Sequence, residues 1–267
     1  SNVGYYPGCV DYLDQEMVFS HVNEGEMNLG DATTSAFTIF DEIGVDVSYL
    51  GRDFLKCCGH DQKWQGLTEV FDKLKAYNQK KIQQSGIDTL VSSCAECFRT
   101  FARDYELEDV KVMHTTEFLI EQGFDMNLKV EEETTVTYHD PCRLGRQMGI
   151  YEEPRELIQS VEGVSIVEME HSGEDAMCCG VSSMMSCNEN ARALRVARME
   201  EIKSTGADTM LTSCPKCVSH FECLKFEGDE RYADIKILDV VSFLAQQINE
   251  KKDKIGQDSI PVIETEA

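Results

Sequence analysis

The sequence predicts an α/β protein built from two duplicated, Rossmann-like lobes, each with a small parallel sheet, related by a pseudo-twofold axis. Three observations lead to this fold class. Short apolar runs alternate with helical segments along the chain, as in parallel sheets covered by helices. One cysteine signature occurs twice, which indicates that one folding unit is repeated. The 267 residues are enough for two compact cores.

In the first half, apolar runs ended by turn residues predict strands, and the longer amphipathic stretches between them predict helices. The expected strands lie near residues 3–6, 45–49, 87–91 and 110–113. The expected helices lie near residues 31–43, 62–84, 94–104 and 115–122. Ligands of parallel sheets collect beyond the carboxyl ends of the strands, so the site is expected in the loops there, between the lobes.

The second half shows the same order of elements. Its expected strands lie near residues 134–138, 164–168, 207–211 and 235–237. Its expected helices lie near residues 151–161, 188–204, 214–226 and 239–250. The charged stretch 127–134 has no apolar period, which predicts a first lobe over 1–127 and a second over 134–250. Residues 251–267 are polar and are expected to form a tail or a partner contact.

Ten of the twelve cysteines form two copies of one signature. The copies are Cys9, Cys57-Cys58-Gly59 and Cys94-Ala95-Glu96-Cys97, then Cys142, Cys178-Cys179-Gly180 and Cys214-Pro215-Lys216-Cys217. Cys58 and Cys94 are separated by 35 residues, and Cys179 and Cys214 by 34. Random placement of cysteines would almost never give this agreement, so the chain contains an internal duplication.

The repeat extends beyond the cysteines. The run Val3-Gly-Tyr-Tyr-Pro-Gly-Cys9 aligns with Val136-Thr-Tyr-His-Asp-Pro-Cys142, and 87–94 aligns with 207–214. Each of these segments is an apolar run that ends in a cysteine, so these cysteines are expected at strand ends. The first copy has 47 residues between Cys9 and Cys57 against 35 between Cys142 and Cys178, and the additional residues are expected within 11–30.

Composition restricts the class of function. The net charge of −24 argues against binding to nucleic acid or to an anionic membrane, because both need a positive surface. No apolar run is long enough for a membrane span and the start does not resemble a signal peptide, so a soluble, cytoplasmic chain is expected. Six disulfides are the less favoured explanation of twelve cysteines, because adjacent cysteines and C-x-x-C at strand ends suit a metal better.

Five cysteines per lobe favour an iron–sulfur cluster over zinc. A structural zinc takes four ligands, usually from two C-x-x-C pairs, and would leave one thiolate over in each lobe. Adjacent cysteines bind one small ion with difficulty, but they can hold different irons of one cluster. The close spacing of a ferredoxin is absent from the chain, so an ordinary ferredoxin cubane is not expected. A scaffold with two structural zinc ions remains an alternative.

At these residues the chain resembles the CCG-domain family, typified by the B subunit of heterodisulfide reductase and the matching part of its D subunit. The family pattern is a cysteine, CCG and C-x-x-C, present twice, and Tyr138-His-Asp-Pro-Cys142-Arg-Leu-Gly is a further family feature. The resemblance covers roughly residues 3 to 250. The long spacing before Cys57 departs from the family pattern.

The resemblance implies that each five-cysteine set binds a noncubane [4Fe-4S] cluster, and that the two clusters face one another across the lobe interface. It implies an oxidoreductase in which a disulfide between the clusters takes two electrons and each sulfur is captured by one cluster. The substrate would be the coenzyme M–coenzyme B heterodisulfide or an analogue. Both cysteine sets are complete, whereas many relatives that act in other reactions have lost ligands.

Other candidate residues lie close to the cysteines in the sequence. An anionic disulfide needs positive charge, and the candidates are Arg143, Arg146, Lys216 and Lys56, with Arg143 favoured. His139 and His60 are candidates to hydrogen-bond cluster sulfur, and Gly59 and Gly180 to allow a turn near the cluster. Three residues are expected to serve packing or the surface: Cys187, Cys223 and His220.

A chain of this kind needs an electron donor, because it has no glycine-rich dinucleotide motif and no second type of cluster motif. The resemblance implies a partner subunit with ferredoxin-like [4Fe-4S] clusters, fed by a flavin subunit or a membrane cytochrome. The competing hypothesis is an electron-transfer subunit whose clusters relay charge to another enzyme. Binding of thiol to the cluster distinguishes the two, because a relay does not need it.

Overall fold

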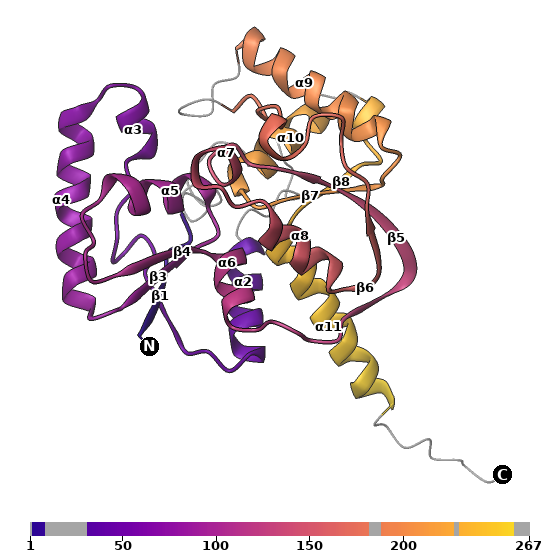
Figure 1. Ribbon diagram of the computed structural model, residues 1–267, viewed down its shortest axis with the longest axis horizontal. Coiled ribbons are helices and arrows are strands. Elements are labelled where there is room, and N and C mark those ends of the chain that lie inside the picture. The colour runs from indigo at the N-terminus through magenta and orange to yellow at the C-terminus, as the bar shows by residue number, and fades with distance from the viewer. Residues whose placement is uncertain (1, 9–30, 182–187, 227–229, 259–267) are drawn as a thin grey trace.

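The computed structural model describes residues 2–8, 31–181, 188–226 and 230–258. Two four-stranded parallel sheets form its two lobes, with strand orders β2-β1-β3-β4 and β6-β5-β7-β8 (Figure 1). The two orders are the same when each sheet is numbered from its own first strand. This confirms the predicted α/β fold of duplicated parallel-sheet lobes.

The elements of the first lobe follow the predicted alternation. Its strands are β1 (Val3–Tyr5), β2 (Val47–Tyr49), β3 (Thr89–Ser92) and β4 (Lys111–His114). Its helices are α2 (Asp31–Glu42), α3 (His60–Trp64), α4 (Thr68–Ser85), α5 (Ala95–Asp104) and α6 (Thr115–Glu121). Strands β1 and β3 are fully buried, as expected of inner strands with helices on both faces.

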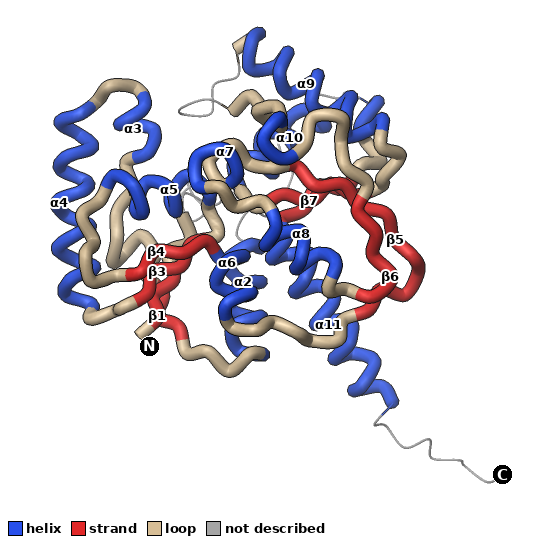
Figure 2. Tube along the Cα trace, viewed as in Figure 1, coloured by secondary structure: helices blue, strands red, loops and turns tan. Residues whose placement is uncertain are grey.

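The second lobe repeats this order. Its strands are β5 (Lys129–His139), β6 (Glu162–Ile166), β7 (Thr209–Thr212) and β8 (Lys236–Asp239). Its helices are α7 (Gly145–Met148), α8 (Glu152–Gln159), α9 (Glu189–Ser204), α10 (Pro215–Phe226) and α11 (Val240–Asp258), with 3-10 turns η2 (Gly173–Asp175) and η3 (Glu230–Tyr232). Figure 2 shows the strands of both sheets between covering helices.

Three elements differ from the sequence-based expectation. The helix expected over 62–84 is two helices, α3 and α4, because Gly66 between them has a positive φ of 78°. Strand β5 begins at Lys129, inside the stretch expected to link the lobes. Helix α11 continues to Asp258, into the expected tail, and the Lys251 amine donates to the Met126 carbonyl at 2.7 Å. The expected lobe boundaries stay a prediction.

The largest hydrophobic core crosses from one lobe to the other. Helix α11 of the second lobe runs beside α2 of the first (Figure 1). Their apolar faces share one core with both sheets, which contains Val3, Tyr5 and Ile39 together with Val136, Tyr138 and Leu244. Burial of these side chains fixes the two lobes against one another, and so fixes the distance between the loops at their strand ends.

Candidate metal centre

The strand ends present cysteines in the same way in both lobes. Cys94 follows β3 and precedes α5, and Cys214 follows β7 and precedes α10. In each lobe the serine before the cysteine is bonded to a tyrosine on the neighbouring inner strand. The hydroxyls of Tyr5 and Ser93 lie 3.0 Å apart, and Tyr138 donates to Ser213 at 3.2 Å. Each C-x-x-C is therefore anchored through an equivalent bond.

The CCG loops also have equivalent geometry. Gly59 and Gly180 both have a φ of 83°, in the left-handed region that favours glycine. The Gly59 amide donates to Cys57 Sγ at 3.4 Å, and the Gly180 amide donates to Cys178 Sγ at 3.3 Å. A Cβ at Gly180 would lie 2.5 Å from the Ala191 carbonyl oxygen. These contacts agree with the expected role of both glycines in a tight turn beside the sulfurs.

The five sulfurs of the second set form a connected group. Thiol hydrogen bonds join Cys142 to Cys178, Cys178 to Cys179, Cys179 to Cys217, and Cys217 to Cys214. The Sγ atoms of Cys217 and Cys179 are 3.4 Å apart. Hydrogen bonds received from neighbouring thiols lower the pKa of Cys178 and of Cys214. All members of this predicted ligand set are therefore close together.

The described sulfurs of the first set are also close to one another. A Cβ at Gly8 would lie 3.4 Å from the Sγ atoms of both Cys94 and Cys97. Burial raises the pKa of the Tyr105 hydroxyl, and the nearby charges of Cys58, Cys57 and Cys97 raise it further. Cys9 follows Gly8 in the sequence but lies outside the described residues. Four members of this set are thus placed around one region of the first lobe.

The two sets meet between the lobes. The Cys94 thiol donates a hydrogen bond to Cys214, which occupies the equivalent position in the other copy. The His114 ring lies 3.2 Å from the Ser93 carbonyl and also bonds the Ser213 carbonyl, so it contacts both lobes. Burial lowers the pKa of His114 to about 4. Contact between equivalent residues is what a twofold relation between the lobes requires.

A buried ion-pair cluster lies beside this contact. Lys216 is 2% exposed, and its amine lies 2.6 Å from Glu96 and 2.7 Å from Asp61, both in the first lobe. Glu96 and Lys216 occupy the same position in their C-x-x-C motifs. Burial raises the pKa of Glu96. For Asp61, burial also opposes ionisation, but a hydrogen bond from His60 and the charge of Lys216 outweigh it and lower the pKa to about 2.

The Arg143 guanidinium links this cluster to the second set. Its Nε donates to His60 Nε2 at 3.1 Å, and it lies 3.8 Å from the centre of the Trp64 ring. Because arginine is always a donor, His60 accepts at Nε2 and its proton is on Nδ1, which faces Asp61 at 2.9 Å. His60 therefore orients charged groups in this structure, and its predicted bond to cluster sulfur stays a prediction.

His139 is held by a second arginine. Arg198 Nε donates to His139 Nδ1 at 3.1 Å, which leaves the ring proton on Nε2. Burial, together with the charge of Arg198, lowers the pKa of His139 to about 3, so the ring is neutral. Its ligating atom lies within 4.8 Å of the sulfurs of Cys179 and Cys217, and Nε2 has no hydrogen-bond partner among the described residues. The expected hydrogen bond from His139 to cluster sulfur stays a prediction.

The remaining candidates lie farther from the sulfurs or have other contacts. Lys56 is exposed, and its amine donates to the Arg52 carbonyl at 3.4 Å. Arg146 is exposed and donates to the Ala176 carbonyl. His220, expected in packing or at the surface, is 1% exposed, and its Nδ1 lies 2.8 Å from the Cys179 carbonyl. Cys223 is buried, and Cys187 lies outside the described residues.

Several residues around the site were missed by the sequence reasoning. Arg195 and Arg198 are both 0% exposed, on the face of α9 that packs towards the second set. Asp239, at the end of β8, occupies the place that His114 occupies at the end of β4. Burial raises the pKa of Asp239 to about 8. The only signal was the position of Arg198 and Asp239 in the repeat, where they align with the buried Asn78 and His114 of the first lobe.

The donor set fits a sulfur-ligated metal cluster. Nine of the ten signature cysteines are described, and all nine lie in two neighbouring groups at the strand ends. In the second group the five thiols hydrogen-bond one another, and binding of a metal would release their protons. Five sulfurs exceed the four ligands of zinc, so an iron–sulfur cluster fits better.

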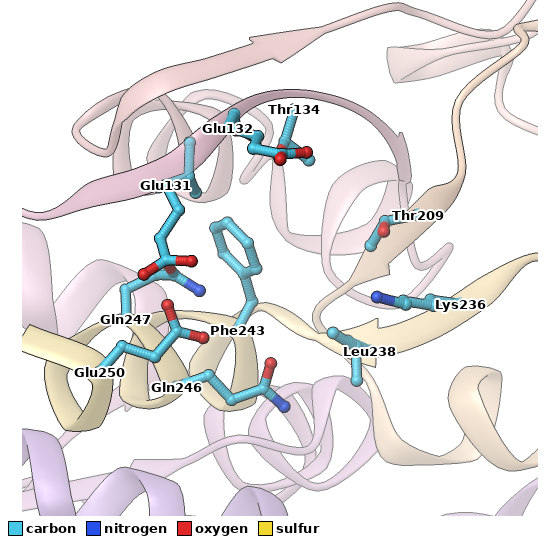
Figure 3. A pocket seen from close by; sticks show the side chains of 11 residues that line it. Glu131, Glu132, Thr134, Thr209, Lys236, Leu238, Phe243, Gln246, Gln247 and Glu250 are labelled. Carbon is cyan, nitrogen blue, oxygen red and sulfur yellow. The ribbon is translucent and has the colours of Figure 1, made fainter. Parts of the chain in front are cut away.

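One cavity lies away from the cysteines. It measures about 320 Å³ and is formed between β5, β8 and α11 (Figure 3). Glu131, Glu132 and Glu250 face it from two sides, with Lys236 at its far edge. No cysteine is among the described residues that line it, so it is separate from the metal centre.

Within the described ranges, no helix combines the length and apolar character that crossing a bilayer requires.

Comparison with known proteins identifies relatives over most of the chain. The D subunit of the heterodisulfide reductase of Methanosarcina acetivorans is 31% identical over 260 residues, which are 93% of this chain and 59% of the relative. The B subunit of the CoM/CoB fumarate reductase of Methanothermobacter marburgensis is 30% identical over 250 residues, 91% of this chain and 46% of the relative. This chain thus spans about half the length of these relatives.

A bacterial relative and a solved structure are also similar to this chain. The probable iron-sulfur-binding oxidoreductase FadF of Bacillus subtilis is 28% identical over 230 residues, 82% of this chain and 32% of the relative. Among solved structures, the aspartate racemase of Picrophilus torridus covers 95% of this chain and 94% of its own at 13% identity, with a TM-score of 0.38 that is too low to support an inference. The family model described as a cysteine-rich domain, CCG, matches residues 3–102 and 136–222, one match in each lobe. With both copies of the cysteine signature inside these matches, the chain belongs to the cysteine-rich CCG domain family and is related to the D subunit of heterodisulfide reductase.

Proposed function

We propose that this chain is the catalytic iron–sulfur part of a heterodisulfide-reductase-like complex, in which a disulfide is reduced by two electrons at two noncubane [4Fe-4S] clusters. One cluster would be held by each five-cysteine set: Cys9, Cys57, Cys58, Cys94 and Cys97 in the first lobe, and Cys142, Cys178, Cys179, Cys214 and Cys217 in the second. The clusters would supply the electrons and an iron site for each product thiolate.

One observation supports this proposal: the described sulfurs of the two sets lie against each other across a single interface. The hydrogen bond between Cys94 and Cys214 brings the sets into direct contact. A disulfide gives two thiolates on reduction, so two neighbouring metal centres can take one each. A relay of electrons over a distance does not need this symmetry, nor five thiolates in each lobe.

Among the predicted substrate-binding cations, Arg143 has the most suitable surroundings. It follows Cys142, is half-buried, and has no ion pair with a carboxylate among the described residues. Stacking on Trp64 and the bond to His60 fix its orientation, so its remaining N–H groups are available to an anionic substrate. Lys216, in contrast, is already paired with Asp61 and Glu96. An anionic substrate would therefore meet Arg143 first.

Electrons would come from a separate subunit. The relatives named above are subunits of reductases, and the chain has no dinucleotide-binding motif of its own. The expected partner carries ferredoxin-like [4Fe-4S] clusters and receives electrons from a flavin or membrane cytochrome subunit. The competing function is an electron-transfer subunit without disulfide chemistry, which the similarity to the oxidoreductase FadF also allows.

Metal analysis and spectroscopy test the proposal. Iron, sulfide and zinc are measured on anaerobically purified protein, and electron paramagnetic resonance is recorded after oxidation with and without coenzyme M. The proposal predicts about eight irons per chain, from two four-iron clusters, and an oxidised signal that appears only with thiol. Eight irons without a thiol-dependent signal would favour the electron relay. Stoichiometric zinc would contradict both.

A further inference from the structure

The two cysteine sets have different electrostatic surroundings, although their backbones are equivalent. The α9 helix places two arginines, Arg195 and Arg198, at 0% exposure beside the second set. Arg198 lies close enough to Cys217 for their charges to interact, and it bonds His139. Arg195 donates to the His220 carbonyl at 3.4 Å, and His220 in turn bonds the Cys179 carbonyl. Buried positive charge therefore lies beside the second set.

Neutral or surface residues occupy the equivalent positions of the first lobe. Counting back four residues from the buried Ile82 and Ile202 gives Asn78 in α4 and Arg198 in α9. The Asn78 amide donates to the carbonyls of Lys56 and Cys57, both at 3.1 Å, and brings no charge. Three residues earlier, Arg195 corresponds to Lys75, whose charge is paired with Glu106 near the surface. No arginine or lysine of the first lobe is buried among the described residues.

The hydrogen-bond donors beside the two sets also differ between the lobes. The Nε2–H of His139 has no acceptor among the described residues, and one ring nitrogen of His139 lies within 4.8 Å of the sulfurs of Cys179 and Cys217. The equivalent residue of the first copy is Tyr6, whose hydroxyl hydrogen is donated to the Lys56 carbonyl at 3.1 Å. An N–H donor without an acceptor among the described residues therefore stands beside the second set, at a position where the first lobe uses its donor on the backbone.

The two sets also differ in how the nearby carboxylates are paired. Asp61 and Glu96 both belong to the first lobe, and the cation that lies between them, Lys216, comes from the second. In the second lobe Glu201 pairs with Arg198 and the buried Asp140 pairs with Arg155, so these two carboxylates are balanced by arginines of their own lobe, and Arg195 adds a further buried positive charge. The potential of an iron–sulfur cluster rises with nearby positive charge and with hydrogen bonds to its sulfurs, because both stabilise the more negative reduced state.

We propose that the two sites are unequal in redox terms, such that a cluster held by the second set is reduced at a higher potential than a cluster held by the first. This inference rests on the proposed function, because it requires that each cysteine set holds a cluster. One electron from an external reductant, the partner subunit or dithionite, would reduce the second-lobe cluster, and a further electron would reduce the first-lobe cluster. The lobes would then take fixed, different roles in the order of electron uptake.

Two substitutions on α9 that change its charge in opposite directions test which cluster has the higher potential. Potentiometric titration of the anaerobically purified chain, followed by electron paramagnetic resonance, should show two one-electron waves. Arg198→Gln keeps a donor for His139 but removes the charge. It should lower the midpoint potential of the wave at higher potential by at least about 59 mV, which is a tenfold change in the equilibrium constant of reduction. Glu201→Gln should raise the same wave. Lys75→Gln is the matched control, in which both waves should stay in place.

The outcomes separate this inference from the proposed function. A chain without two clusters overturns the proposed function. Two clusters with one common potential, or a shift of the lower wave in the α9 variants, overturn the inequality alone. If circular dichroism shows that Arg198→Gln does not fold, Glu201→Gln decides, because its side chain is 13% exposed and its change removes a charge near the surface. A merely structural role of these residues would not give shifts of opposite sign.

Discussion

Replacing Lys216 by methionine should destabilise the protein strongly. Methionine has a similar volume but leaves the carboxylates of Asp61 and Glu96 without the amine that now lies 2.7 and 2.6 Å away. Lys216 is 2% exposed, so water does not replace it. Removing one partner of a buried ion pair costs about 3–5 kcal/mol, because the remaining charge stays buried without compensation.

Urea unfolding, followed by circular dichroism under anaerobic reducing conditions, measures this loss. The control is Lys75→Met, which removes an ion pair with Glu106, a residue whose side chain is 78% exposed. A surface pair of this kind contributes about 1 kcal/mol or less. Neutralising both carboxylates together with Lys216 should recover much of the stability, since no buried charge is then left. A Lys216→Met variant that loses no more stability than the control would refute the reasoning.

Three further predictions follow from the geometry of the strand ends and loops. Gly180→Ala should lower the free energy of unfolding by more than about 2 kcal/mol in thermal or urea unfolding. The control Gly206→Ala has a similar φ but no atom within 4 Å of the new Cβ, so it should lose only the ~1–2 kcal/mol of the left-handed conformation. Equal losses would contradict the clash with the backbone. The pKa of Asp239 is raised from its ordinary value of 3.8 to about 8 in the fold. The free energy of unfolding should therefore fall by up to about 1.4 kcal/mol per pH unit as the pH rises between these two values. Asp239→Asn should flatten that slope in urea unfolding measured at several pH values. Tyr138→Phe should cost about 1 kcal/mol in the same assay through the lost bond to Ser213, and an unchanged midpoint would show that the bond contributes nothing.

The sequence was sufficient for the fold and for the grouping of the cysteines. Two nearly equal spacings, of 35 and 34 residues, identified the duplication, and apolar runs ending in cysteine placed Cys94 and Cys214 at strand ends, where parallel sheets put their ligands. The structure places both cysteines there. The break between α3 and α4 was not predicted, because a single glycine in a helical pattern is tolerated as often as it ends a helix.

Contacts between distant residues were beyond the sequence reasoning. Lys216 was expected to bind substrate because its charge is evident in the sequence, but its burial between two carboxylates depends on how the lobes pack. Arg198 lies on a helix of mixed polarity and was not distinguished from surface arginines, although it is 0% exposed. Pairwise burial of this kind depends on tertiary packing, which local periodicity does not encode.

The ion pair between Glu96 and Lys216 has a consequence for how duplicated lobes choose their partners. The two residues stand at the same place in the repeat, so the lobes are complementary in charge although they are alike in fold. Contact between two first lobes would bury two glutamates together, and contact between two second lobes would bury two lysines. A newly made chain therefore gains from joining its own unlike halves, and self-association of like halves during synthesis is penalised at the very surface where the sulfurs must meet.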